Sequence, residues 1–189
     1  YQYKMNGKRV LLFGADNLFD KRKGLRILLD TFRNNLINDN NEYYLFTFGR
    51  GKIRERKINN LNIINFGYLN NKMKLNELFN LADVLLLPSE IDNLPQIGLE
   101  AQTSGLPIIT FKNSGLQELI DENKTGFFCE LENSINLGNT ISSFFEQARN
   151  FDTMRNNCRN RSLNLWSEEV VFKKYYTLYS NILDKKINF

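Results

Sequence analysis

Two carboxylates flank a proline in the segment "PSEIDNLPQIGLEAQ", residues 88–102. Pro95 suits the first position of a helix because it has no amide hydrogen to leave unpaired there, and we expect Asn93 to cap that helix. The backbone amides of the first turn, from Gln96 to Gly98, would carry a partial positive charge at the helix mouth. This pattern predicts a site for an anion such as a phosphate, and Gly98, which has no side chain, would leave the approach open.

Glu100 lies one turn beyond Gln96 in the expected helix, on the same side of it. Its carboxylate would point toward the helix mouth, where it could accept hydrogen bonds from vicinal hydroxyls such as those of a ribose. Asp92, just before the helix, could accept from hydroxyls on another part of the same ligand. The residues alone leave a plainer interpretation equally open, in which Asp92 forms a turn and Glu100 is an exposed helix residue.

Basic residues gather in two segments, residues 20–26 and 49–57, and the net charge of the chain is +4. In the first segment Lys21, Arg22 and Lys23 precede Gly24. There a lysine could contact a diphosphate with its compact ammonium charge, and an arginine could donate two parallel hydrogen bonds to it. Such clusters fit phosphate, nucleic acid or membrane headgroups, and they also occur as solvated surface loops. Composition does not choose between these partners.

The remaining composition excludes several classes of chemistry. The chain contains no histidine, which rules out serine–histidine and cysteine–histidine catalysis and most zinc sites within it. Cys129 and Cys158 lack metal-ligand spacing, so we expect buried thiols. There is no apolar run of about 20 residues and no signal-peptide pattern at the N-terminus, so we expect a soluble, cytoplasmic protein.

Short apolar segments alternate with amphipathic ones along the first two thirds of the chain. We expect strands over residues 9–15, 42–51, 61–69, 83–88, 106–111 and 126–129. We expect helices over residues 24–36, 70–82, 95–104, 115–120, 134–149, 152–164 and 167–184. This alternation predicts a single α/β domain over residues 1–189, a Rossmann-like, doubly wound parallel sheet flanked by helices. Ligands of such sheets bind beyond the carboxyl ends of the strands, where the charged segments fall.

Two segments together resemble a known family: "FGADNLFDKRKGL" and "FGYLNNKMKLNELFNLADVLLLPSEIDNLPQIGLEAQTSGLPIITFKNSGLQELIDENKTGF". They are similar to the carboxy-terminal, nucleotide-sugar-binding domain of family-4 (group 1) glycosyltransferases of the bacterial polysaccharide type. The resemblance covers residues 9–184 and is most specific over residues 66–126. It implies one half of a GT-B fold, in which two Rossmann-like domains face each other.

The resemblance assigns roles to the residues singled out above. In this family an acidic residue, seven intervening residues and a glutamate form the donor signature, and Asp92 and Glu100 occupy those two places. Glu100 would bind the ribose hydroxyls and Asp92 the transferred sugar, while Lys23, assisted by Arg22, would bind the diphosphate. Four further donor-binding residues would lie in the backbone before and at the helix mouth, namely Leu94, Pro95, Gln96 and Ile97. Leu69 would border the base.

The chain also departs from the family pattern. The first acid is usually glutamate, the usual Phe-Gly pair is Leu94–Pro95, and the usual Gly-Gly loop is Ser114–Gly115. Family members usually place an arginine just after the first strand, where this chain offers only Ala15, Asp16 and Asn17. Arg22 is the replacement that we expect.

The implied activity is transfer of a sugar from a UDP- or GDP-sugar to a glycan or a lipid-linked acceptor, with retention of configuration and without a cofactor or bound metal. Helix amides and basic side chains would stabilise the departing diphosphate. Because the chain begins directly before the first strand, we expect the amino-terminal acceptor domain to be absent from it and the fragment alone to be inactive. A lipid-linked acceptor would bring the full enzyme to the inner face of the membrane.

Two alternatives belong to other classes. One is half of a GT-B sugar-nucleotide epimerase, which usually needs carboxylates and histidines spread over two domains. The other is a non-catalytic nucleotide- or nucleic-acid-binding module, which the basic loops would suit. We expect no nucleic-acid partner, because basic and aromatic residues do not interleave and no recognition helix is evident. Salt-sensitive oligonucleotide binding that is unaffected by Glu100→Ala would favour the second alternative.

Overall fold

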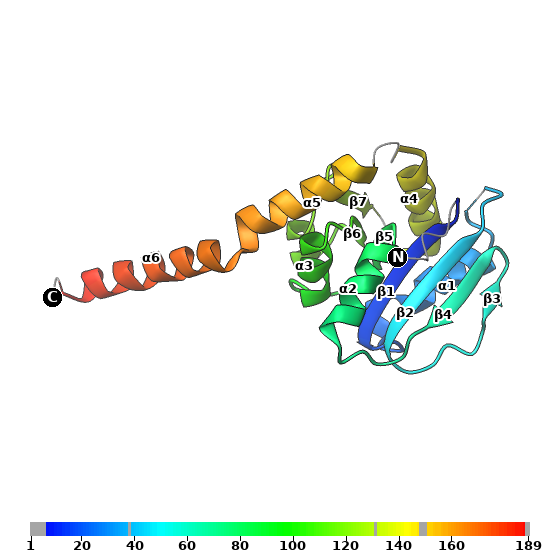
Figure 1. Ribbon diagram of the computed structural model, residues 1–189, viewed down its shortest axis with the longest axis horizontal. Coiled ribbons are helices and arrows are strands. Elements are labelled where there is room, and N and C mark those ends of the chain that lie inside the picture. The colour runs from blue at the N-terminus through cyan, green and yellow to red at the C-terminus, as the bar shows by residue number, and fades with distance from the viewer. Residues whose placement is uncertain (1–6, 38, 131, 148–150, 188–189) are drawn as a thin grey trace.

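The computed structural model describes residues 7–37, 39–130, 132–147 and 151–187, and within these residues it contains one seven-stranded sheet (Figure 1). The strand order is β3-β4-β2-β1-β5-β6-β7, and only β3 runs antiparallel to its neighbour. The strands are β1 (Arg9–Asn17), β2 (Tyr43–Arg50), β3 (Lys57–Ile58), β4 (Leu61–Asn65), β5 (Val84–Leu87), β6 (Ile108–Phe111) and β7 (Gly126–Cys129). Without β3, the order of the six parallel strands is that of doubly wound dinucleotide-binding sheets, which confirms the predicted fold class.

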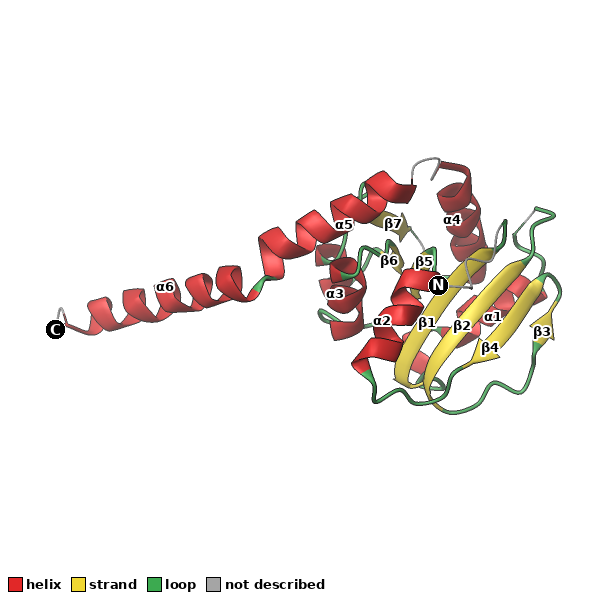
Figure 2. Cartoon of the chain, viewed as in Figure 1, coloured by secondary structure: helices red, strands yellow, loops and turns green. Residues whose placement is uncertain are grey.

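Helices cover both faces of this sheet (Figure 2). α1 (Leu25–Arg33) and α4 (Ser134–Gln147) pack against one face, around Leu11 and Phe13 of β1. α2 (Lys72–Leu81) and α3 (Gln96–Thr103) pack against the other face, around Leu12 of β1 and Leu85 of β5. Because both faces are buried, the central strands are continuous apolar runs rather than alternating ones, and all four residues of β5 are buried.

The predicted elements differ from the structure mainly at their ends. β4, predicted over residues 61–69, ends at Asn65. The Asn65 side chain accepts a hydrogen bond from the Gly67 amide at 2.8 Å, and Gly67, with a φ of +68°, turns the chain away from the sheet. Residues 114–118 form a short 3₁₀ helix, η2, in place of the helix predicted over 115–120. The two-residue edge strand β3 was not predicted.

Two helices complete the chain. α5 (Phe151–Trp166) packs against α3, and its Cys158 is fully buried beside Gln102, whose Nε2 lies 3.5 Å from the thiol sulfur. Cys129 is also buried and neither thiol is in a disulfide, as predicted. α6 (Glu168–Ile187) then extends away from the rest of the molecule (Figure 1). No helix in the part of the chain that the structure describes is long and apolar enough to cross a bilayer.

Candidate functional site

A cleft of about 480 Å³ lies at the carboxyl ends of β1 and β2 and beside the loop that follows β5. This is where the connections of the sheet change direction, since β2 lies on one side of β1 and β5 on the other. The cleft is lined by Gly14, Ala15, Asp16, Lys23, Phe48, Gly49, Tyr68, Leu69, Asp92, Pro95, Gln96, Ile97 and Glu100. Seven of the nine residues predicted from the sequence are therefore brought together in one cavity.

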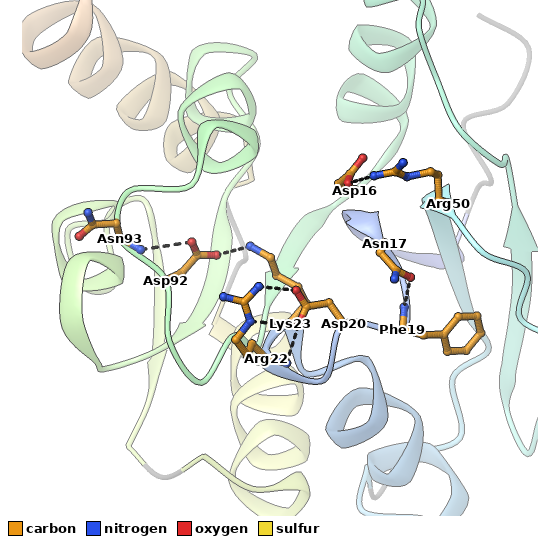
Figure 3. A network of polar contacts seen from close by, with 9 residues as sticks. All are labelled: Asp16, Asn17, Phe19, Asp20, Arg22, Lys23, Arg50, Asp92 and Asn93. Atoms are coloured by element: carbon orange, nitrogen blue, oxygen red, sulfur yellow. Dashed lines mark hydrogen bonds and ion pairs between the residues drawn. The ribbon is translucent and has the colours of Figure 1, made fainter.

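Lys23 and Asp92 meet in this cleft although they are far apart in the sequence (Figure 3). The Lys23 Nζ lies 2.6 Å from Asp92 Oδ2, and the two side chains are 30% and 18% exposed. Asp92 Oδ1 also accepts a hydrogen bond from the Asn93 amide at 3.2 Å. The ion pair places a cation and a carboxylate at the end of the sheet where a ligand would enter.

Backbone packing holds the loops of this ion pair together. Gly24, directly after Lys23, has a left-handed φ of +74°, and a Cβ built on it would lie 1.8 Å from the carbonyl oxygen of Pro88. Next to it, the Glu90 amide donates to the Arg22 carbonyl oxygen at 2.9 Å. Only glycine allows the loop after β1 to approach the loop after β5 this closely.

A second contact supports the β5–α3 loop from the side of η2. The Asn113 side-chain amide donates to the carbonyl oxygens of Ser89 at 3.1 Å and Glu90 at 2.8 Å. A Cβ on Gly115 would lie 1.8 Å from the Asn93 carbonyl oxygen, so the chain there passes directly against the loop. The family usually has two glycines here and this chain has Ser114–Gly115. The glycine that it keeps, Gly115, is the one that must lack a side chain for the chain to pass against Asn93.

The helix mouth differs in two respects from the prediction. Pro95, not Asn93, is the residue that precedes the first helical residue, and no side chain caps the helix. Pro95 has an extended ψ of 127°, so the helix begins one residue later, at Gln96. The prediction of Asn93 as cap and Pro95 as first helical residue is therefore wrong.

Gly98 does not have the role that the sequence predicted for it. It is buried, and a Cβ built on it would lie 2.8 Å from the side chain of Leu119, the residue after η2, so this glycine lets α3 pack against Leu119 and does not open the mouth to a ligand. Its amide donates to the Pro95 carbonyl oxygen at 2.9 Å. The amides of Gln96 and Ile97 precede this first bond and, as in the first turn of any helix, have no acceptor within the helix.

Glu100 lies on the cleft side of α3, one turn after Gln96. Its Oε1 accepts a hydrogen bond from Gln96 Nε2 at 3.3 Å, and the side chain is partly exposed. A partly exposed carboxylate with a single long hydrogen bond retains lone pairs for the hydroxyls of a ligand.

Arg22 and Leu94 do not line the cleft. The Arg22 guanidinium lies against the carboxylate of Asp20, with Nη2 2.7 Å from Oδ2, and is 66% exposed. Their hydrogen bond raises the pKa of Arg22 and lowers the pKa of Asp20, so both groups are charged at neutral pH. Leu94 is exposed on the loop.

The structure adds lining residues that the sequence analysis did not select. Tyr68 is 57% exposed beside Leu69 on the loop after β4. Gly49 lies so close to β1 that a Cβ on it would be 1.8 Å from the Ala15 carbonyl oxygen. The sequence did carry a signal for the lining residues Gly14 and Gly49, because Phe-Gly occurs near the end of the first two predicted strands, at Phe13–Gly14 and Phe48–Gly49.

Arg50 is a further cation beside the cleft. Arg50 ends β2 and forms an ion pair with Asp16, which lies near the end of β1 and lines the cleft (Figure 3). Among the lining residues only Lys23 is positively charged, whereas Asp16, Asp92 and Glu100 are acidic. Each of the two nearby cations, Lys23 and Arg50, is thus bound to a carboxylate that an anionic ligand could replace.

The chain matches a family model and two named bacterial proteins. Residues 4–163 match the model of the family described as "Glycosyl transferases group 1". An "Uncharacterized 41.2 kDa protein in cps region" of Klebsiella pneumoniae is 26% identical over 165 residues, which are 86% of this chain and 44% of that protein. The UDP-Gal:alpha-D-GlcNAc-diphosphoundecaprenol alpha-1,3-galactosyltransferase of Escherichia coli is 30% identical over 105 residues, 56% of this chain and 27% of that enzyme. The chain spans less than half the length of both relatives.

The fold is similar to that of solved structures as well. The Anabaena protein HepE, crystallised with UDP and glucose, superposes with a TM-score of 0.74 at 18% sequence identity. The superposition covers 95% of this chain and 50% of HepE. At this level of identity the likeness establishes the fold, one half of a GT-B architecture.

Proposed function

The chain belongs to the group 1 glycosyltransferases, and we propose that its cleft binds the nucleotide-diphosphate sugar donor of the transfer reaction. One observation carries the proposal: Glu100, Lys23 and the mouth of α3 converge on one cavity at the switch point of the sheet. A nucleotide-diphosphate sugar needs a hydrogen-bond acceptor for its ribose hydroxyls, a cation for its diphosphate and backbone amides for its distal phosphate, all within a short distance of one another. The cleft supplies all three.

In this arrangement Glu100 accepts hydrogen bonds from the ribose hydroxyls, and the loop containing Tyr68 and Leu69 borders the base. The amides of Gln96 and Ile97 face the distal phosphate, where the helix dipole favours negative charge. That HepE was crystallised with UDP and glucose supports a UDP-sugar as the donor. GDP-sugars are the second candidate class.

The Lys23–Asp92 ion pair gives the site a simple way to respond to its ligand. A diphosphate competes with Asp92 for the Lys23 ammonium, and Asp92, once released from Lys23, can accept hydrogen bonds from the sugar. During transfer, with retention of configuration, Lys23 and the helix amides stabilise the charge that develops on the leaving diphosphate. Removing one such contact typically raises the barrier by about 3 kcal/mol.

The acceptor belongs to the complete enzyme. Because this chain spans about half of HepE and less than half of the two bacterial relatives, we infer that the acceptor site needs a second domain facing the cleft. The name of the Escherichia coli relative includes a diphosphoundecaprenol acceptor, which supports a lipid-linked acceptor and peripheral association with the membrane.

A thermal-shift panel of nucleoside diphosphates and their sugars tests the donor site. A ligand at a hundredfold excess over its dissociation constant adds about 2.7 kcal/mol of stability, which raises the melting midpoint of a chain of this size by about 5–10 °C. We expect UDP or GDP to produce this shift and Glu100→Ala to abolish it.

Glu77→Ala provides the matched control, since Glu77 is an exposed glutamate on α2 outside the cleft lining. It should keep the full shift. If no nucleotide stabilises the chain, or if Glu100→Ala responds like the wild type, the donor-site assignment is wrong. Tight, salt-sensitive binding of oligonucleotides by both proteins would instead support a nucleic-acid-binding module.

A further inference from the structure

A second hollow, of about 530 Å³, lies between α1, the loop after β1 and the loop after β2. We call it the basic groove. It is lined by Leu18, Phe19, Asp20, Lys21, Leu25, Arg26, Leu29, Arg33, Lys52, Ile53, Arg54 and Glu55. None of these residues lines the cleft described above. The basic groove is therefore a separate surface on the same domain.

Positive charge dominates the rim of the basic groove. Its lining includes five cations and two acids, which gives a net charge of +3. The two acids are already bound to arginines: Asp20 to Arg22, and Glu55 to Arg33 with 2.6 Å between Oε1 and Nη2. Lys21, Lys52 and Arg54 are exposed at the rim and have no ion pair within the described residues.

The floor of the groove is apolar, and one aromatic ring stands at its edge. Leu18, Leu25, Leu29 and Ile53 form the floor, and the core of the domain continues beneath them. Phe19 is 57% exposed, and its ring lies against Gly51, where a Cβ would come within 2.9 Å of it. The Phe19 backbone amide donates to Asn17 Oδ1 at 3.0 Å, so a hydrogen bond holds the backbone that carries the ring. An exposed aromatic ring among lysines and arginines is typical of surfaces at a membrane–water interface.

We propose that the basic groove docks on anionic phospholipid headgroups, with Phe19 entering the interface between the phosphates. The five cations come from three elements around the groove, namely the connection after β1, α1 and the loop after β2, which suits a layer of phosphates better than a single free phosphate. One ring over an apolar floor suits lipid better than nucleic acid, which is bound by several stacking rings along a basic track.

The position of the groove links it to the proposed function. The end of β1 contributes Ala15 and Asp16 to the cleft, and the connection after β1 contributes Lys23 to the cleft and Leu18, Phe19 and Lys21 to the basic groove. Docking at the groove would therefore hold the cleft beside the membrane surface. This inference deepens the proposed function and rests on it for the lipid-linked acceptor, whereas lipid binding itself can be measured without any donor.

Co-sedimentation with vesicles tests the inference. We expect the 189-residue chain to sediment with vesicles of phosphatidylcholine and phosphatidylglycerol, and not with vesicles of phosphatidylcholine alone. Each cation near an anionic surface contributes roughly fivefold to binding, so the double variant Lys52→Glu/Arg54→Glu should bind at least about 25-fold more weakly. Phe19→Ala should weaken binding to a smaller extent.

Lys124→Glu/Arg159→Glu is the matched control, because it makes the same change of charge. Both residues are exposed, and Lys124 lies just before β7, at the opposite end of the sheet from Lys52, which follows β2. The inference is overturned if the two double variants bind alike, if neutral vesicles bind equally well, if glycerol phosphate displaces the chain from vesicles, or if single-stranded RNA binds more tightly than vesicles do. The UDP thermal shift, read on the same variants, reports separately on the donor site.

Discussion

At the scale of single residues, each of the two cations at the cleft forms an ion pair with a carboxylate. Lys23 is bound to Asp92, and Arg50 is bound to Asp16. The family usually has an arginine just after the first strand, and this chain has Asp16 in that region. Neither Arg50 nor Arg22 lines the cleft, but Arg50, from the neighbouring strand, is paired with Asp16, which does line it, whereas Arg22 is paired with Asp20, which does not. Arg50 is thus better placed than Arg22 to provide the second positive charge for a diphosphate.

Arg50→Ala should therefore weaken UDP binding by about tenfold, since hydrogen bonds to charged groups contribute about 1.5–3 kcal/mol. Asp16→Asn should strengthen UDP binding, because it releases Arg50 from its partner. Isothermal titration calorimetry with UDP and with uridine separates the phosphate contribution from that of the base and ribose.

Uridine affinity should stay the same in both variants, because uridine carries no phosphate. Arg159→Ala, which removes an exposed arginine on α5, should leave both affinities unchanged. Equal losses for UDP and uridine would contradict a role at the diphosphate.

The two buried thiols should make the free energy of unfolding depend on pH. Burial raises the pKa of Cys129 and of Cys158 from 9 to about 12. The unfolded chain therefore loses both thiol protons at a lower pH than the folded chain, so this part of the stability is complete below pH 9 and is lost as the pH rises toward 12. From about pH 8 to about pH 10 the free energy of unfolding should fall by on the order of 2 kcal/mol.

Urea unfolding at the two pH values measures this loss. The double variant Cys129→Ala/Cys158→Ala provides the reference, because lysines and tyrosines titrate alike in both proteins. Its unfolding free energy should depend less steeply on pH than that of the wild type. Parallel pH profiles would mean that the thiols do not carry the effect.

At the scale of elements, the site depends on how closely two loops approach. Gly24 combines a φ of +74° with a Cβ position 1.8 Å from the Pro88 carbonyl oxygen, whereas Gly67 has a similar φ of +68° and no atom within 4 Å of its Cβ position. Gly67→Ala should cost about 1 kcal/mol of stability, from backbone strain alone, and Gly24→Ala about 3 kcal/mol or more.

Chemical denaturation compares the two glycine variants directly. Gly24→Ala should also lower UDP affinity, because pushing the loops apart moves Lys23 away from the mouth of α3 and from Glu100, with which it shares the cleft. Two glycine variants of equal stability would show that the loops can separate without cost, and the close approach would then not be what positions the site.

The elements also show what the sequence could and could not predict. Continuous apolar runs such as Val84–Leu87 predict buried parallel strands, and the doubly wound order follows from their alternation with helices. The seven predicted residues that line the cleft lie in the connections after β1, β4 and β5 or in the first two turns of α3, all at the carboxyl edge of the sheet, which is why the sequence could place them together.

The remaining features depend on contacts that local sequence does not determine. The start of α3 at Gln96 depends on the extended ψ of Pro95, and the inward position of Gly98 depends on Leu119, directly after η2. The pairing of Arg50 with Asp16 depends on the register of β1 against β2, which shifts between Gly14 and Asn17. Spacing along the chain carries no information about such a shift.

At the scale of the whole molecule, both proposed sites lie at the carboxyl edge of the sheet and share one loop, while α6 extends in another direction (Figure 1). Apolar side chains recur at helical spacing along α6 and are exposed, namely Phe172, Tyr175, Tyr176, Tyr179, Ile182 and Leu183. Within the described residues their rings stack only along the helix itself, Phe172 on Tyr176 and Tyr175 on Tyr179. Exposed apolar stripes of this size are typical of contact surfaces, and we expect other parts of the complete enzyme to cover this one.

The triple variant Phe172→Ser/Tyr176→Ser/Tyr179→Ser tests this interpretation. Because these side chains do not contribute to the core of the domain, the melting midpoint should stay within about 2 °C of the wild-type value. The wild-type chain should self-associate as its concentration rises, since the stripe is exposed to water, and the variant should remain monomeric in sedimentation velocity. A large drop in the midpoint would mean that α6 folds back onto the sheet domain in solution. In the complete enzyme, slow hydrogen exchange along α6 that becomes fast when the chain is produced alone would show that the stripe is covered there by the rest of the protein.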